Sequence, residues 1–227
     1  YAVATLCYAE VEPDDPDGVN PGLRRALPGD WGAIGAWAFG LSRAMDYLVK
    51  DSAIDARKVA VTGHSRLGKT ALWAGAQDQR FAMVISNNSG EGGASLARRK
   101  TGERIADSVR VNRVWYTPKY RQYVDREETL PVDAHFLIAL SAPRPVYVAS
   151  ASEDAGADPE GEFLAAKAAE PVYRLFNKKG LEIDKFPATD RSFGDYVGYH
   201  VRKGVHDILI ADWEHYLNFA DRHFNTK

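Results

Sequence analysis

Apolar residues follow two different spacings along this chain. Short apolar runs predict strands at 2–8, 59–62, 81–86, 145–150 and 181–186. Stretches in which apolar residues recur every three or four positions predict helices at 31–49, 71–76, 134–140, 161–176 and 207–224. Strands that alternate with helices are typical of a mostly parallel sheet with helices packed on its faces. The pattern therefore predicts an α/β fold.

The segments between these elements resemble loops rather than boundaries between domains. Residues 10–22 are acidic and rich in Pro and Gly, and residues 98–126 are basic with little periodicity. The chain shows no internal repeat, no low-complexity tract and no interdomain linker. We therefore predict a single domain over 1–227, in which only one predicted strand precedes the strand at 59–62.

The composition argues against several classes of protein. The 227 residues are 45% hydrophobic and 26% charged, which is ordinary for a globular domain. A formal net charge of −2 gives no basis for binding nucleic acid or an anionic membrane. Cys7 is the single cysteine, so no internal disulfide can form, and no zinc spacing of the H-E-x-x-H kind occurs. The chain begins at Tyr1, so we expect a mature chain or an excised piece of a longer one.

The segment from Lys58 to Thr70 carries the strongest chemical signal. A β-branched run at 59–62 leads into Gly63, and Ser65 follows between a histidine and an arginine before the helical pattern begins. A strand that turns sharply into a helix around one serine exposes the serine hydroxyl beside the backbone N–H groups of the helix start. This arrangement predicts that Ser65 is the nucleophile of an α/β-hydrolase.

The same residues also fit a phosphate-binding motif. Gly63 to Thr70 matches G-x-x-x-x-G-K-[ST], the P-loop of nucleotide-binding proteins. A P-loop enzyme needs a second strand that ends in Asp to bind Mg²⁺. The strand at 81–86 is instead followed by Asn87 and Asn88. The hydrolase interpretation is therefore favoured, and a P-loop nucleotide-binding protein is a remote alternative.

A serine hydrolase also needs a carboxylate and a histidine, which follow the serine in that order in this fold. Glu153 and Asp154 come just after the strand at 145–150. We choose Asp154 as the acid and keep Glu153 as the alternative. His206 lies in a Gly-containing loop before the last helix and is the predicted base, with His200 as the next candidate.

Residues 63–69, Gly-His-Ser-Arg-Leu-Gly-Lys, resemble the G-x-S-R-x-G-K motif of glucuronoyl esterases, carbohydrate esterase family 15. Further stretches resemble the same family, and its bacterial members above all, at 89–93, 130–135, 142–145, 157–163 and 204–207. The resemblance implies an α/β-hydrolase, a three-layer sandwich with a mostly parallel sheet. It also implies a serine esterase that cleaves the ester between 4-O-methyl-glucuronate of glucuronoxylan and lignin alcohols, without a metal or a cofactor.

The resemblance assigns roles to single residues. Ser65 matches the nucleophile and His206 the general base. Arg66 matches the residue that stabilises the oxyanion, which is sensible because a fixed cation stabilises developing negative charge. Lys69 matches a lysine that binds sugar hydroxyls. Two further residues are candidates for substrate contact. Glu91 is expected near the turn at Ser65, and Trp115 is aromatic.

The carboxylate is where this sequence departs from part of the family. Many fungal relatives carry Glu at the position of Asn88, whereas some bacterial relatives use an acid after the later strand, here Asp154 or Glu153. Relatives also tend to carry a Trp shortly after this acid, where this chain has Ala155 and Gly156. Because family members are longer, we expect this chain to be a C-terminal portion that lacks part of the N-terminal sheet.

Two other functions remain open. A general carboxyl or acetyl esterase of the same fold would use the same serine. A catalytically silent carbohydrate-binding relative is suggested by Asn88 and by the absent Trp. The resemblance implies a secreted or periplasmic location and an ester of glucuronoxylan and lignin as the substrate. We expect a monomer, with no nucleic-acid or membrane partner.

Overall fold

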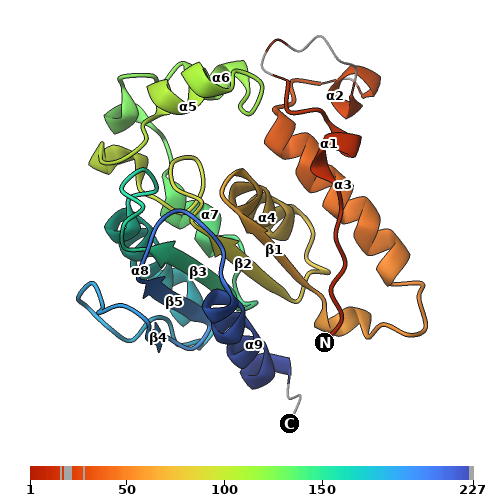
Figure 1. Cartoon of the computed structure of the whole chain (residues 1–227), viewed down its shortest axis with the longest axis vertical. Coiled ribbons are helices and arrows are strands. Elements are labelled where there is room, and N and C mark those ends of the chain that lie inside the picture. Colours follow the sequence, from red (N-terminus) through yellow and green to blue (C-terminus); the bar gives the residue numbers. More distant parts are fainter. Residues whose placement is uncertain (16, 18–21, 28, 225–227) are drawn as a thin grey trace.

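A five-stranded sheet forms the centre of the structure, a computed structural model that describes residues 1–15, 17, 22–27 and 29–224 (Figure 1). The sheet order is β1-β2-β3-β5-β4. Its strands are β1 (Ala60–His64), β2 (Met83–Asn87), β3 (Val146–Ala151), β4 (Ser192–Phe193) and β5 (Val197–Arg202). Only β4 pairs antiparallel, with β5, and the other pairs are parallel. The prediction of an α/β fold with a mostly parallel sheet is confirmed.

Helices cover both faces of the sheet, so the fold has three layers (Figure 1). The main helices are α3 (Ala33–Leu48), α4 (Arg66–Gln77), α7 (Ala134–Ala139), α8 (Pro159–Leu175) and α9 (Ile210–Phe224). One core joins α3, α4, α7 and α8 to strand residues such as Val84, while the other joins Phe219 of α9 to Met83. Neighbouring strand residues point to opposite faces, so Met83 and Val84 belong to different cores.

The remaining helices are short and lie outside the sheet. They are α1 (Tyr8–Val11), α2 (Leu23–Ala26), α5 (Ile105–Val111) and α6 (Pro118–Arg121), with 3-10 turns at Ala56–Lys58, Ala97–Arg99 and Glu127–Thr129. In Figure 1, α5 and α6 lie beyond the carboxyl ends of the strands. They belong to the basic segment whose sequence shows little periodicity. None of the helices described here is long and apolar enough to cross a membrane.

Two predicted strands are wrong. Residues 2–7 form no regular structure and are exposed, and Tyr8 already belongs to α1. A strand needs a neighbour that accepts and donates backbone hydrogen bonds. Within the described ranges, no strand pairs with residues 2–8. Residues 181–186 likewise form no strand.

The apolar spacing along the sequence did not predict β5. All six of its residues are buried, although His200 and Arg202 are polar. The carboxylate of Asp212 accepts hydrogen bonds from both, at 2.8 Å from His200 Nε2 and 3.0 Å from Arg202 Nε. Buried polar groups are tolerated when they are hydrogen-bonded, so a strand in the core can carry them.

The close approach of α4 to β2 gives a test of the packing. A Cβ on Gly75 of α4 would lie 2.3 Å from Cγ2 of Val84, whereas on Gly35 of α3 the nearest atom would be 3.7 Å away. We predict that Gly75→Ala lowers the free energy of unfolding by about 1–3 kcal/mol through overpacking. The matched control Gly35→Ala raises it by about 0.5–1 kcal/mol through helix propensity. Urea denaturation measures both, and similar effects of the two changes would contradict the packing of α4 on β2.

Candidate active site

Ser65 sits in a sharp turn between β1 and α4. Its backbone has φ 58° and ψ −126°, a conformation that residues other than glycine rarely adopt. Gly63 makes the turn possible, because a Cβ there would lie 2.1 Å from the carbonyl oxygen of Leu67. A Cβ on Gly68 would lie 3.0 Å from the carbonyl oxygen of Asn87. The strand, the strained serine and the helix therefore form the elbow that the sequence predicts.

His206 and Asp154 lie on the two loops that face this turn. His206 follows β5, Asp154 follows β3, and the imidazole Nδ1 donates a hydrogen bond to Asp154 Oδ2 at 2.5 Å. Ser65, His206 and Asp154 line one cavity of about 480 Å³. The structure thus brings together the three residues predicted from chain order. Glu153, the alternative acid, is exposed and does not line the cavity.

The pKa values of this pair are shifted in opposite directions. The hydrogen bond with Asp154 raises the pKa of His206, against the opposing effect of burial. Burial would raise the pKa of Asp154, but hydrogen bonds from His206 and Asn88 together outweigh it and lower this pKa. Asn88 Nδ2 donates to Asp154 Oδ2 at 2.7 Å. Asn88 therefore orients the carboxylate and does not supply one.

A buried arginine fixes the loop that carries His206. The guanidinium of Arg202 donates hydrogen bonds to three carbonyl oxygens, those of Lys203, Val205 and Asp207. Its Nε donates to Asp212, so the arginine is anchored from the helix side as well. His200, the second candidate for the base, is fully buried and hydrogen-bonded to Asp212. It faces the core and not the cavity.

Arg66, the predicted oxyanion residue, begins α4 directly after Ser65. Its guanidinium forms an ion pair with Asp14 and lies 5.1 Å from the ring centre of Trp115. Asp14 also accepts a hydrogen bond from Trp115 Nε1 at 2.9 Å and another from Asn112. Sequence reasoning missed Asp14, because in the sequence it is one of several acidic residues in a Pro-rich loop.

Lys69 and Glu91, two predicted substrate contacts, take different positions. Lys69 lines the cavity, and its ammonium donates hydrogen bonds to the carbonyl oxygens of Ser89, at 2.6 Å, and Glu91. Burial lowers the pKa of this lysine. The carboxylate of Glu91 is buried, accepts a hydrogen bond from Tyr120, and has its pKa raised by burial. Lys69 and the predicted Trp115 line the cavity, whereas Glu91 does not.

Two residues that the sequence did not single out also lie at this site. Glu103 lines the cavity from the turn before α5. No sequence signal marks Glu103, because its place at the cavity depends on the turn at Gly102, which has φ 69° in the structure. The ring of His64 lies 4.5 Å from that of His206, and burial lowers the pKa of His64.

The groups gathered here are a hydroxyl, an imidazole, carboxylates and an ammonium. A hydroxyl next to an imidazole that is oriented by a carboxylate suits nucleophilic acyl transfer. Among residues 1–15, 17, 22–27 and 29–224, no cluster of three His, Cys, Asp or Glu side chains could hold a metal ion.

Comparison with known proteins identifies the family of this chain. The family model for glucuronyl esterases of fungi matches residues 28–177. The chain belongs to the glucuronoyl esterase family. The resemblance predicted from the sequence motifs is therefore confirmed.

This glucuronoyl esterase chain is similar to prokaryotic proteins over nearly its whole length. Carbohydrate esterase MZ0003, from an unknown prokaryotic organism, is 49% identical over 234 residues, which cover 98% of this chain and 54% of that protein. A glucuronoyl esterase structure from Solibacter usitatus has TM-score 0.91 and 50% identity, over 96% of this chain and 58% of the other. A structure titled as a promiscuous CE15 esterase from a marine bacterial metagenome has TM-score 0.88 and 49% identity, over 94% and 56%. The chain thus spans little more than half the length of these relatives.

The anchor behind the His206 loop predicts a large effect on stability. Arg202→Met leaves the buried carboxylate of Asp212 without its cationic partner, which costs about 3–5 kcal/mol in comparable buried pairs. Arg57→Met removes an ion pair with Asp55 on the surface and is the matched control. Chemical denaturation should show a large loss for the first variant and little change for the second. Equal effects would contradict the anchoring role.

The hydrogen bond between His206 and Asp154 predicts a pH dependence. The raised pKa of His206 stabilises the fold below about pH 6.5, the ordinary value, and this contribution is lost as the pH rises through the folded-state pKa. The lowered pKa of Asp154 stabilises the fold above about pH 3.9, and this contribution is lost as the pH falls. NMR titration should show the pKa of His206 falling in Asp154→Asn. The control Glu153→Gln should leave it unchanged, and a shift in that variant instead would identify Glu153 as the partner.

Proposed function

We propose that this chain carries the catalytic site of a serine esterase that hydrolyses the ester of 4-O-methyl-glucuronate in glucuronoxylan. The observation that carries the proposal is the cavity shared by Ser65, His206 and Asp154, with the imidazole hydrogen-bonded to the carboxylate. Membership of the glucuronoyl esterase family supports the uronate ester as the substrate.

The proposed reaction begins with proton transfer from Ser65. Because His206 Nδ1 carries the hydrogen that Asp154 accepts, its Nε2 is free to take the proton of the serine hydroxyl. Ser65 Oγ then forms a bond to the ester carbonyl carbon, and the carbonyl oxygen becomes an oxyanion. As the oxyanion collapses, the bond to the alcohol breaks and His206 protonates the leaving oxygen. Water attacks the acyl-enzyme in the same way and releases the uronic acid.

The oxyanion needs donors fixed before the reaction begins. The N–H groups of Arg66 and Leu67 open α4 and precede its first intrahelical hydrogen bond, which Gly68 donates to Ser65. The guanidinium of Arg66 does not line the cavity and is paired with Asp14, so the backbone N–H groups carry this assignment. We therefore assign oxyanion stabilisation to the start of α4.

Recognition of the sugar is assigned to three other residues that line the same cavity. Lys69 brings an ammonium, Glu103 a carboxylate and Trp115 an aromatic face, all beside Ser65. These groups suit hydroxyls and the flat apolar face of a sugar ring. Glu91 would act behind Lys69, by fixing the backbone that the ammonium contacts. A lignin alcohol as the leaving group, secretion or a periplasmic location, a monomeric state and a role in lignocellulose degradation belong to the same proposal.

A general carboxylesterase is the second candidate. The marine metagenome enzyme, which is described as promiscuous, matches 94% of this chain at 49% identity. Ala155 and Gly156, where relatives tend to have a Trp, also leave this edge of the cavity without a large side chain. Broad ester specificity would use the same serine, so only a comparison of substrates separates the two functions.

The test is hydrolysis of benzyl glucuronate and benzyl acetate by the wild type, Ser65→Ala and Ser52→Ala. Ser65→Ala should lower kcat by about 10⁴-fold or more, because the attacking oxygen is gone. Ser52 is exposed between α3 and β1, so its variant should behave as the wild type. A clear preference for the glucuronate ester is the expected result. Equal rates on the acetate would favour the general esterase, and turnover that survives Ser65→Ala would overturn both functions.

A further inference from the structure

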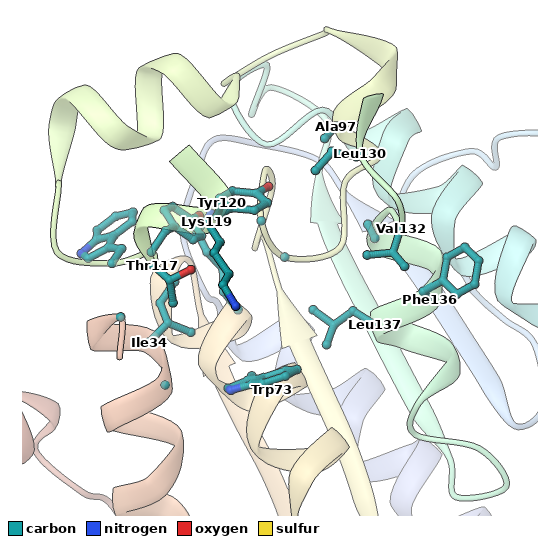
Figure 2. A pocket seen from close by; sticks show the side chains of 18 of the residues that line it. Ile34, Trp73, Ala97, Thr117, Lys119, Tyr120, Leu130, Val132, Phe136 and Leu137 are labelled. Carbon is teal, nitrogen blue, oxygen red and sulfur yellow. The ribbon is translucent and has the colours of Figure 1, made fainter. Parts of the chain in front are cut away.

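Two buried carboxyl groups, those of Glu91 and Glu162, lie near residues 88–90, a turn that lines the catalytic cavity. The carboxylate of Glu91 accepts a hydrogen bond from Tyr120. Figure 2 shows Tyr120 in the wall of a separate hollow of about 860 Å³. Glu162 instead contacts the turn itself, on the side of the catalytic pair, and the proposed reaction gives it no part.

Glu162, in the first turn of α8, binds the backbone of the 88–90 turn. Its Oε1 accepts hydrogen bonds from the N–H groups of Ser89, at 2.8 Å, and Gly90, at 2.9 Å. Its Oε2 lies 2.6 Å from the hydroxyl oxygen of Ser150 on β3. Successive N–H groups that converge on one oxygen form a concave site for an anion. The turn therefore suits the ionised carboxylate.

The same turn contacts the loop that carries the catalytic acid at two points. The side chain of Asn88 donates a hydrogen bond to Asp154, and a Cβ on Gly90 would lie only 3.1 Å from the Cα of Ala157. Asn88 has φ 47°, a conformation that needs support from its surroundings. Glu162 binds the two residues that follow Asn88, so it fixes the amide that orients Asp154.

The charge of Glu162 also reaches the catalytic pair. The N–H and O–H groups that bind its carboxylate are neutral, so they do not cancel a negative charge. The titratable groups of neighbouring elements that interact with this charge are Lys69 of α4, Asp154 after β3, His206 after β5, Tyr199 of β5 and Tyr216 of α9. Burial raises the pKa of both tyrosines far above their usual range, so they stay neutral.

We propose that Glu162 is a positioning residue for the catalytic pair. Its ionised carboxylate holds the turn that orients Asp154, and its charge stabilises the imidazolium that His206 becomes when it takes the proton of Ser65. This catalytic consequence rests on the proposed function, whereas the coupling between Glu162 and His206 does not.

Protonation of Glu162 removes its charge without breaking the turn. A proton on Oε2 can be donated to the oxygen of Ser150, because a hydroxyl both donates and accepts. Oε1 then still accepts the two N–H groups of the turn. The carboxyl group can therefore change its charge while the backbone around the catalytic pair stays in place.

Glu162 and His206 titrate in the same pH range. Burial raises the pKa of Glu162 to about 7, against the hydrogen bonds from Ser150 and the 88–90 turn. The hydrogen bond with Asp154 raises the pKa of His206 above its ordinary value. As the pH falls, Glu162 takes up a proton, its charge disappears, and His206 becomes less basic. The titration curve of His206 should therefore be broader than that of an isolated group.

NMR titration of His206 in the full chain tests this coupling. Glu162→Gln keeps the shape, because its amide oxygen can accept both N–H groups and its NH₂ can donate to Ser150. The curve of His206 should become narrower and move to lower pH in this variant. The matched control is Glu170→Gln, which changes the other buried glutamate of α8, a group bound to the N–H of Leu181. The control should retain the curve of the wild type.

His64, whose ring lies 4.5 Å from that of His206, is present in all three proteins, so it does not account for a difference between them. A curve that is the same in the wild type and in folded Glu162→Gln would overturn the proposal.

A second variant keeps the test independent of the folding of Glu162→Gln. Ser150→Ala retains Glu162 and both N–H groups but removes one donor to the carboxylate. The pKa of Glu162, followed by ¹³C NMR of its carboxyl group, should therefore rise. Ser141→Ala changes another buried serine, whose hydroxyl has no hydrogen-bond partner among the described residues, and should leave this pKa unchanged. Equal carboxyl titrations in Ser150→Ala and the wild type would contradict the proposal.

Kinetics on benzyl glucuronate give the catalytic readout. Glu162→Gln should lower kcat about three- to tenfold, because a less basic imidazole is a weaker general base, and should leave KM nearly unchanged. The acid limb of kcat/KM should move to lower pH, which a loss of folded protein would not produce. An unmoved acid limb with unchanged kcat would overturn the catalytic consequence. Absence of turnover in the wild type would count against the proposed function alone, because NMR judges the coupling by itself.

Discussion

The close approach of α4 to the sheet is the constraint on which the candidate site depends. Three glycines set this distance, because a Cβ on Gly63, Gly68 or Gly75 would meet the carbonyl of Leu67, the carbonyl of Asn87 or the side chain of Val84. A helix held so near the strands forces the chain through a sharp turn. The strained backbone of Ser65 is the result of this turn. Packing of a helix on a sheet thus places a hydroxyl at the carboxyl end of β1.

Buried carboxylates hold the loops that surround this hydroxyl. Glu162 accepts hydrogen bonds from the N–H groups of Ser89 and Gly90, at 2.8 and 2.9 Å, and from the hydroxyl of Ser150 at 2.6 Å. Burial raises the pKa of Glu162 to about 7. Asp212 supports the loop that carries His206 in a similar way, because it accepts a hydrogen bond from Arg202. The loops at the carboxyl ends of the strands are therefore supported by hydrogen bonds to buried carboxyl groups as well as by apolar packing.

The parts of the site that could be predicted from the sequence are those fixed by local chain geometry and by chain order. The elbow at Ser65 needs only a strand, small residues and a helix, and the order of acid and histidine separates Asp154 and His206 from most alternatives. Asp14 and Glu103 could not be found, because their position depends on long-range contacts of irregular segments. The strand β5 was missed for a related reason: the partner that satisfies its buried polar residues lies on α9.

The exposure of the histidine has a consequence for the second half of the proposed reaction. The side chain of His206 keeps 43% of its surface open to solvent, while the carboxylate behind it is buried. After the alcohol departs, the ring must take a proton from a water molecule that enters in its place. A ring already in contact with bulk water needs no opening of the chain to meet that molecule. Many enclosed active sites admit water only after part of the chain moves. Here the loop that carries His206 leaves the ring open to water without such a movement.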